Sequence, residues 1–168
     1  MKRAALWLIL IVIGCTKGEN MTLKITSPEF ENNGIIPDKY TCNGMGVNPP
    51  LKIEGIPINA ETLALIVDDP DAPMGAWDHW ILWNIPAKID EIREASVPEG
   101  ALQGGNGWVR KDYGAPCPPN GTHRYFFKIY ALDTKLELNT ESNKKDVENA
   151  MEGHVIEKAE LIGLFKKE

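Results

Sequence analysis

Several residue types are scarce in this sequence, and each shortage argues against a class of protein. Only three of the 168 residues are cysteine, which excludes a small scaffold built on many disulfides. Lys and Arg total 18 against 24 Asp and Glu, a net charge of −6 with no basic stripe, so the chain is a poor candidate for binding nucleic acid. None of its three serines lies in a Gly-x-Ser-x-Gly motif, which leaves a serine hydrolase of that kind unsupported.

The residues that are present suit one globular domain. Hydrophobic residues make up 43% of the chain and charged residues 25%, which is too apolar for a disordered protein. A chain of 168 residues is long enough for one hydrophobic core but short for two. No internal repeat, low-complexity tract or break in composition divides residues 21–168, so the sequence predicts a single domain.

The first 15 residues have the organisation of an export signal. A basic start, Met1–Arg3, precedes an unbroken apolar run over residues 4–13, and Gly14 and Cys15 close it before a polar stretch. Ten helical residues rise about 15 Å, half of a bilayer core of roughly 30 Å, so the run predicts a signal peptide rather than a membrane span. Residues 12–15, Val-Ile-Gly-Cys, are similar to a bacterial lipobox, in which the cysteine is acylated and becomes the mature first residue.

These features predict a lipoprotein-type signal peptide over residues 1–15, a short linker over 16–22 and a folded domain over 23–168. Because the domain is acidic, we expect acyl chains on Cys15, not a basic surface, to hold it at the membrane of the cell envelope. Two alternatives stay open. The apolar run could be a buried N-terminal strand or helix, and translation could begin at Met21, which would leave the protein in the cytoplasm.

Cys42 and Cys117 are interpreted in the light of that compartment. Both lie in segments rich in Gly and Pro, where a buried apolar thiol is less expected, and an exported protein meets an oxidising environment. We therefore favour a disulfide between them, which in the chain-entropy model contributes about 4 kcal/mol. Two separate free thiols are the alternative.

Apolar patterning predicts a protein made mostly of β-strands. Residues 63–67 form a continuous apolar run typical of a buried strand, and residues 80–85 and 125–131 are mostly apolar segments rich in residues that favour strands. Residues 23–25 and 51–54 alternate, and residues 161–165 are a further candidate strand. Residues 31–50 are dense in Asn, Gly and Pro and predict a loop. One helix is expected over residues 142–158, because Val147, Met151 and Val155 repeat at helical spacing. Short strands between long loops indicate a β-sandwich.

Polar side chains gather where these strands begin and end. The run over residues 63–67 leads directly into Asp68, Asp69 and Asp71, and Pro70 and Pro73 stiffen that loop. His79 stands between tryptophans at the entrance to the next strand. A Pro/Gly-rich loop over residues 114–121 leads to a third strand, which begins with His-x-Tyr.

Alternate residues of a strand share a face, so His123 and Tyr125 are expected to point the same way. Two imidazoles, a phenol and loop amides would form a pocket rich in hydrogen-bond donors, suited to a phosphate, sulfate or carboxylate. A carboxylate such as Asp69 would orient one imidazole. We expect aromatic walls from Trp77, Trp80 and Tyr113.

Each of these residues also has an ordinary structural interpretation. Asp69 and Asp71 could simply cap the turn after the strand, and His79 could be a hydrogen-bonded core residue. Arg124 is expected to point away from its neighbours and form a structural ion pair. Trp108 and Tyr113 could belong to the core, and His154 is interpreted as solvated helix surface.

Two long segments carry a specific resemblance. "DDPDAPMGAWDHW" and "YGAPCPPNGTHRYFFKIYALD", in that order and about 40 residues apart, resemble the phosphatidylethanolamine-binding protein family, and especially its bacterial and archaeal Raf kinase inhibitor-like branch. The similarity extends from about Leu23 to Phe165.

The resemblance implies a fold with a large central antiparallel sheet, a smaller second sheet and few helices. It also implies a small anion pocket for a phosphate-bearing headgroup, lined by Asp69, Asp71, His79, Pro119, His123 and Tyr125. The family's prokaryotic branch is often dimeric, so a homodimer is expected. No long helix follows residues 160–165 here, which departs from the animal members and puts their kinase partners in doubt.

Three functions follow as hypotheses. The first is a binding protein for a phosphate-like anion or phospholipid headgroup, with regulation of a partner protein as an additional role. It implies no cofactor, no metal and no catalysis. The second is an inhibitor of a protease or kinase that acts through the loops around the pocket. The third, less favoured, is a hydrolase. Cys117 lies six residues before His123, but a disulfide would abolish it as a nucleophile, and no His-x-x-x-His or Cys-x-x-Cys spacing supports a metal.

Overall fold

A computed structural model of the chain describes residues 22–167. The signal peptide, the lipidation site at Cys15 and nearly all of the linker lie outside these residues and stay predictions. Within the described part, no helix is long and apolar enough to cross a membrane.

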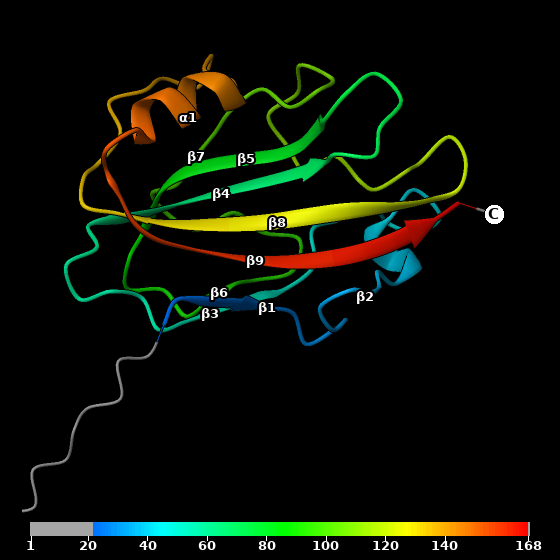
Figure 1. Cartoon of the computed structure of the whole chain (residues 1–168), viewed down its shortest axis with the longest axis horizontal. Helices are drawn as coiled ribbons and strands as arrows, with labels where there is room; N and C mark the ends of the chain where they lie inside the picture. Colours follow the sequence, from blue (N-terminus) through cyan, green and yellow to red (C-terminus); the bar gives the residue numbers. More distant parts are fainter. Residues whose placement is uncertain (1–21, 168) are drawn as a thin grey trace, which may run out of the picture.

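The fold consists of two β-sheets and one α-helix (Figure 1). The smaller sheet has three strands in the order β1-β3-β6, and the larger has six in the order β2-β9-β8-β4-β5-β7. The elements of the smaller sheet are β1 (Lys24–Thr26), β3 (Leu51–Glu54) and β6 (Glu91–Ile92). Those of the larger sheet are β2 (Gly34–Ile35), β4 (Thr62–Asp69), β5 (Trp77–Pro86), β7 (Leu102–Gln103), β8 (Thr122–Leu132) and β9 (Val155–Lys166). The predicted mostly-β fold with a large and a small sheet is confirmed.

The larger sheet departs from the expectation in one respect, because it is mixed. Every described strand pair in it is antiparallel except β2 with β9, whose residues Gly34 and Ile35 run parallel to Gly163 and Leu164. Residues 31–50, predicted as a loop, thus contribute a short edge strand, and also the 3₁₀ helix η1 (Asp38–Tyr40). Neither was recognisable, since two- and three-residue elements have no measurable hydrophobic period.

Burial explains why the central strands form. All eight residues of β4 are buried, because the smaller sheet covers one face and α1 (Lys144–Met151) contributes to the cover of the other. Leu65 and Val67 belong to the core between the two sheets, whereas Ala64 and Ile66 pack in the cluster that includes Val147 of α1. A strand covered on both faces appears as a continuous apolar run, which is what the sequence shows.

The predicted helix over residues 142–158 is wrong at its C-terminal end. Asn143 caps the N-terminus of α1 by accepting hydrogen bonds from the amides of Lys145 and Asp146. The helix ends at Met151 because Gly153 adopts a φ of 81°, and β9 begins at Val155. His154 is therefore in a turn rather than on a helix, with its Nδ1 2.8 Å from Asp133 Oδ1.

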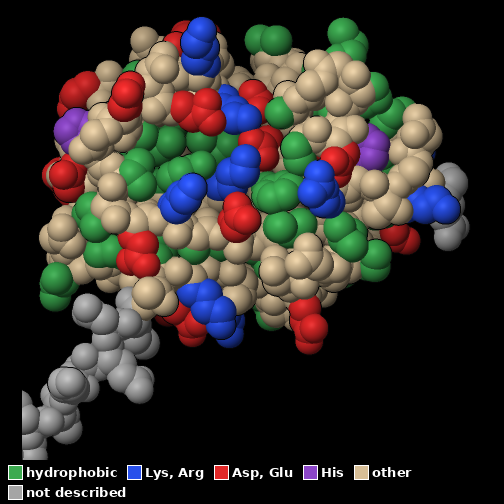
Figure 2. All heavy atoms as spheres, in the orientation of Figure 1, with side chains coloured by type: hydrophobic (Ala, Val, Ile, Leu, Met, Phe, Trp, Pro, Cys, Tyr) green, Lys and Arg blue, Asp and Glu red, His purple; other side chains and the backbone are tan. Residues whose placement is uncertain are grey.

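The outer face of β8 and β9 carries intermixed acidic, basic and hydrophobic side chains (Figure 2). Lys128 of β8 forms an ion pair with the buried Asp68 at 2.8 Å, and Lys144 at the start of α1 reaches the same carboxylate at 2.7 Å. These two ammonium groups compensate the charge of an aspartate that is only 2% exposed. Asp68 thus faces away from the sheet interface, whereas the next residue, Asp69, faces toward it.

The structure pairs Cys42 with Cys117 in a disulfide that joins the loop after η1 to the loop before β8, with their Cα atoms 5.4 Å apart. The predicted disulfide is confirmed, and the two free thiols are not. Both half-cystines are exposed.

Candidate functional site

A cavity of about 290 Å³ lies where β4, β5 and β8 meet the loops that flank them. Its polar lining consists of Asp69, His79, His123 and Tyr125, each no more than 5% exposed. The remaining walls are made by Ala72, Pro73, Met74, Trp77, Trp108, Cys117, Pro118 and Pro119. A few convergent polar groups in a largely apolar hollow are typical of a small-ligand site.

His123 is held by a carboxylate. Its Nδ1 lies 2.7 Å from Asp69 Oδ2, and since a carboxylate oxygen only accepts, Nδ1–H is the donor. The other oxygen of Asp69 accepts from the amide of Asp71 at 2.8 Å, so the carboxylate cannot rotate freely. The ring is thereby fixed with Nε2 as its remaining polar atom.

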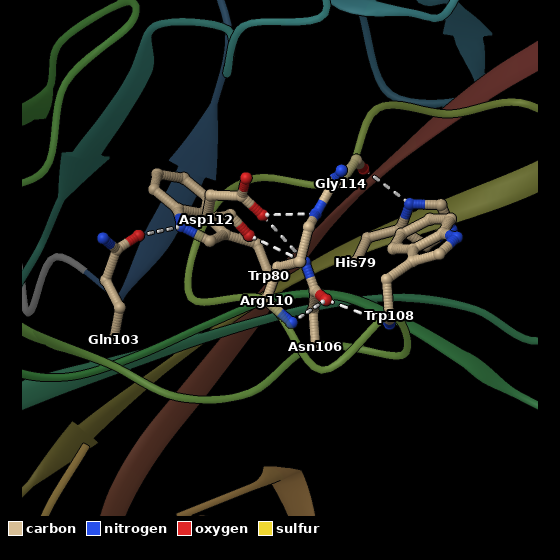
Figure 3. A network of polar contacts seen from close by, with 8 residues as sticks. All are labelled: His79, Trp80, Gln103, Asn106, Trp108, Arg110, Asp112 and Gly114. Carbon is tan, nitrogen blue, oxygen red and sulfur yellow. Dashed lines mark hydrogen bonds and ion pairs between the residues drawn. The ribbon is translucent and has the colours of Figure 1, made fainter. Parts of the chain in front are cut away.

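His79 is fixed by a carbonyl instead. Its Nδ1–H donates to the Gly114 oxygen at 2.6 Å, and the Gly114 amide donates back to the His79 carbonyl at 2.8 Å (Figure 3). Burial lowers the pKa of His79 below its ordinary value, against the opposing influence of the Gly114 hydrogen bond and of nearby carboxylates such as Asp69. The ring is therefore neutral near pH 7, with a lone pair on Nε2.

A β-bulge brings His79 to the cavity. β4 and β5 shift register between Val67 and Asp68, where Val67 pairs with Trp80 but Asp68 pairs with Asp78. His79 is the additional residue, so it is released from strict strand alternation. Its ring then lies 5.1 Å from that of Tyr125, edge to face.

Two buried donors near this cavity have no partner among residues 22–167. They are the Tyr125 hydroxyl and the indole Nε1 of Trp77, both of which belong to cavity-lining residues. Burial, and then the charge of Asp69, raise the pKa of Tyr125, so its phenol keeps its proton. A buried donor without a partner is costly, and a bound acceptor would remove that cost.

Asp71 takes a structural role. Its carboxylate accepts from the Arg124 guanidinium at 2.7 and 2.9 Å and from the Arg124 amide at 3.0 Å, and it does not line the cavity. The hydrogen bonds from Arg124 lower the pKa of Asp71 to about 2. The pair joins the β4–β5 loop to the start of β8, as the ion pair expected for Arg124, and holds the amide that orients Asp69.

The aromatic walls differ from the prediction. Trp77 does line the cavity, but Trp80 and Tyr113 pack edge to face against each other at 5.7 Å elsewhere in the core. Trp80 donates its Nε1–H to Gln103 at 2.8 Å, and the Tyr113 hydroxyl donates to the Tyr40 carbonyl at 3.1 Å. These hydrogen bonds hold both rings away from the cavity.

Trp108, which the sequence suggested could be core, supplies the second aromatic wall, 5.2 Å from the His79 ring. Figure 3 shows how the loop that carries it is held. The buried Asn106 accepts from the amides of Trp108 and Arg110 at 3.0 and 3.1 Å and donates to the Asp112 carbonyl at 3.0 Å. A Cβ on Gly114 would lie 2.2 Å from the Trp108 ring, so the close approach needs glycine there.

The structure thus brings together Asp69, His79, Pro119, His123 and Tyr125, and excludes Asp71 from the lining. Sequence reasoning missed Asn106 and the role of Trp108. The Asn-Gly-Trp sequence of this loop indicates a turn, but a turn signal does not reveal which cavity the loop covers. Among the described residues, no group of three or more His, Cys, Asp or Glu side chains is arranged to hold a metal ion.

Fold and cavity together define a class, a β-sandwich protein with a ligand-sized hollow at the ends of its central strands. The chain belongs to the phosphatidylethanolamine-binding protein family, whose sequence model matches residues 26–166. It is 49% identical over 171 aligned residues to a UPF0098 protein of Pyrococcus horikoshii, covering 95% of this chain and 85% of that one. It is 45% identical to a UPF0098 protein of Methanothermobacter thermautotrophicus, covering 86% and 99%.

Solved structures agree with this assignment. A phosphatidylethanolamine-binding protein homologue from Chlamydia trachomatis superimposes with a TM-score of 0.85 at 39% identity, covering 88% of this chain and 99% of that chain. E. coli YbcL, described as a member of the mammalian family, gives a TM-score of 0.82 at 29% identity, covering 88% and 100%.

Proposed function

We propose that this protein binds a small anion, a phosphate or the phosphate-bearing headgroup of a lipid, in the cavity described above. The observation that carries the proposal is a set of fixed groups whose polar atoms have no partner among residues 22–167: Nε2 of His79, Nε2 of His123 and the Tyr125 hydroxyl. Family membership supports the same ligand class.

The negative charge of Asp69 in the cavity means that anion binding depends on the protonation of the histidines. Asp69 is buried in its lining, so with neutral imidazoles the cavity would repel an anion. Each Nε2 donates a hydrogen bond only when its ring is protonated. Binding is therefore expected to take up protons, unless the ligand carries its own hydroxyl, as monohydrogen phosphate does.

The cavity is larger than an inorganic phosphate needs, and its walls are apolar. This supports a phosphomonoester with a compact organic group over the free ion. The lining residues also favour binding over catalysis. The cysteine nearest the histidines, Cys117, is oxidised in the Cys42–Cys117 disulfide and cannot act as a nucleophile. We retain envelope attachment through Cys15 and a homodimeric state as further proposals.

Titration calorimetry of phosphorylethanolamine and of inorganic phosphate tests the binding function. Replacing His79 with Ala removes a charge-assisted hydrogen bond, so we expect a loss of about 2 kcal/mol, roughly thirtyfold in affinity. His79 is preferred to His123 as the target, because removing His123 would leave the buried Asp69 carboxylate without its partner.

His154→Ala is the matched control, since it removes the third histidine of the chain at an exposed position paired with Asp133. It should bind as the wild type does. Equal heats from wild type and His79→Ala would contradict this cavity as the site.

An inhibitor of a protease or kinase is the second candidate. The observation that favours it is the exposed apolar rim, in which Met74 and Val109 are 94% and 88% exposed. Partner capture from an envelope extract that is lost on Met74→Ser and Val109→Ser but unchanged by His79→Ala would support this function over anion binding.

A further inference from the structure

One wall of the cavity, formed by the loop over residues 117–121, has few hydrogen bonds to the rest of the protein. The last hydrogen bond before β8 that holds this loop is from the Cys42 amide to the Pro116 carbonyl, at 3.0 Å. Pro118 and Pro119 have no N–H to donate. Within the described structure, the disulfide is the covalent attachment of this wall, and the buried Pro118 adds packing contacts.

The segment at the other end of the disulfide, which leads to Cys42, is firmly held. Tyr40 is 1% exposed and donates its hydroxyl to Glu94 at 2.7 Å, while its carbonyl accepts from Tyr113. Thr41 is fully buried, and both its amide and its hydroxyl donate to the Asp38 carbonyl at 3.0 Å. Cys42 follows directly, so the disulfide connects a well-anchored segment to a wall that has few hydrogen bonds of its own.

That wall forms part of the binding site. Cys117, Pro118 and Pro119 all line the cavity together with His79 and Tyr125. Both half-cystines are exposed residues, so the bridge lies at the protein surface. The same covalent bond therefore lies at the surface and belongs to a wall of the cavity.

From these observations we propose that Cys42–Cys117 is a reversible thiol–disulfide exchange site that controls the affinity of the cavity, a proposal that rests on the anion-binding function above. Its co-reactant is a dithiol, either a small molecule or a Cys-x-x-Cys oxidoreductase. When the bond is oxidised the wall is in place and the anion is held; when it is reduced the wall moves and the anion is released.

The exchange balances in two steps. A thiolate of the dithiol attacks one sulfur of the bridge, a mixed disulfide forms, and the other cysteine leaves as a thiolate that takes up a proton. The second thiolate of the reductant then attacks the reductant's first sulfur, which is bonded to the protein in the mixed disulfide. The remaining cysteine is released as a thiolate and is also protonated. Two cysteines are reduced and one dithiol is oxidised.

Sulfate titration of the purified protein before and after treatment with dithiothreitol tests this inference, with both thiols counted by alkylation and mass spectrometry. We expect at least about a tenfold loss of affinity on reduction and full recovery on reoxidation. The Cys42→Ser/Cys117→Ser variant should match the reduced wild type and ignore the reductant. Hydrogen exchange supplies a readout without ligand: after reduction the segment around residues 115–121 should exchange faster, at times too short for the buried strand β4 to exchange in either form.

Unchanged affinity with both cysteines alkylated would overturn the proposal. Loss of the near-UV circular dichroism signal on reduction would overturn it too, because the bridge would then support the whole fold rather than one wall. If the oxidised protein binds no anion, the anion-binding function fails, and the exchange data alone then decide whether the bridge holds the wall.

Discussion

Lowering the pH from about 8 to about 6 should strengthen sulfate binding by up to roughly a hundredfold, because the site must gain a proton to accept a fully ionised anion. Sulfate stays a dianion over this range, so it cannot supply the proton itself. The His79 Nδ1–H is already committed to the Gly114 carbonyl, which leaves Nε2 for the ligand. A neutral Nε2 presents a lone pair to the anion.

The lowered pKa of His79 determines whether sulfate affinity rises or falls with pH. Burial holds the pKa of His79 below that of an ordinary histidine, so the ring is uncharged at pH 7. Above that pKa, each unit of pH lowers the protonated fraction tenfold, and affinity falls by the same factor for each proton taken up. Below it, the affinity reaches a plateau. The titratable groups around this ring are Asp68, Asp69, Asp78, His123 and Tyr125.

Stability without ligand should change in the opposite direction. As the pH falls through the ordinary histidine range, the unfolded chain protonates His79 while the folded chain resists it, so the free energy of unfolding decreases. Calorimetry at several pH values measures the affinity, and His79→Ala should show a shallower slope. An affinity that is constant with pH, or that increases as the pH rises, would contradict proton-coupled binding.

Of the changes proposed for this protein, removing the disulfide should lower the free energy of unfolding the most. Cys42 and Cys117 are 75 positions apart, and closing a loop of that length restricts the unfolded chain by about 4 kcal/mol in the chain-entropy model. The Cys42→Ser/Cys117→Ser variant should lose about that much free energy of unfolding, measured by urea titration. Because domains are typically stable by about 5–15 kcal/mol, the variant should still fold without denaturant.

Wild type in reductant is the companion measurement. Its unfolding free energy should fall to that of the variant, whereas the variant should be insensitive to reductant. A loss below about 1 kcal/mol would show that the denatured chain is already compact around this bridge, contrary to the entropy model.

Hydrophobic pattern was a good guide to the core strands of the fold. The apolar runs at residues 63–67 and 80–85 lie inside β4 and β5, because strands covered on both faces need apolar side chains at nearly every position. The run at residues 125–131 lies inside β8, where buried and partly exposed residues alternate. The pattern failed at the end of α1, where Val155 continued the helical spacing although Gly153 had already ended the helix. Backbone conformation at one glycine outweighed periodicity there.

The site was predictable where it follows strand geometry. His123 and Tyr125 share a face because they are two residues apart in β8, and both line the cavity. The position of His79 depends on a bulge that only the pairing with β4 creates, so no local pattern reveals it. The family motif placed Asp71 in the pocket, but its carboxylate is bound to Arg124, which could not be known without the arrangement of the loop.

Trp108 shows a different kind of limit. Its place over His79 requires glycine at position 114 and the hydrogen bonds of Asn106, and these come from a loop without a regular period. Loops of this kind are positioned by contacts with elements distant in the sequence, so their destination is a property of the whole fold.

A crystal structure of the oxidised protein grown from phosphate tests the central claim most directly. We predict tetrahedral density in the cavity within hydrogen-bond distance of His79 Nε2, His123 Nε2 and the Tyr125 hydroxyl. An empty cavity in crystals that hold phosphate elsewhere, or apolar side chains filling the space between those three groups, would contradict it.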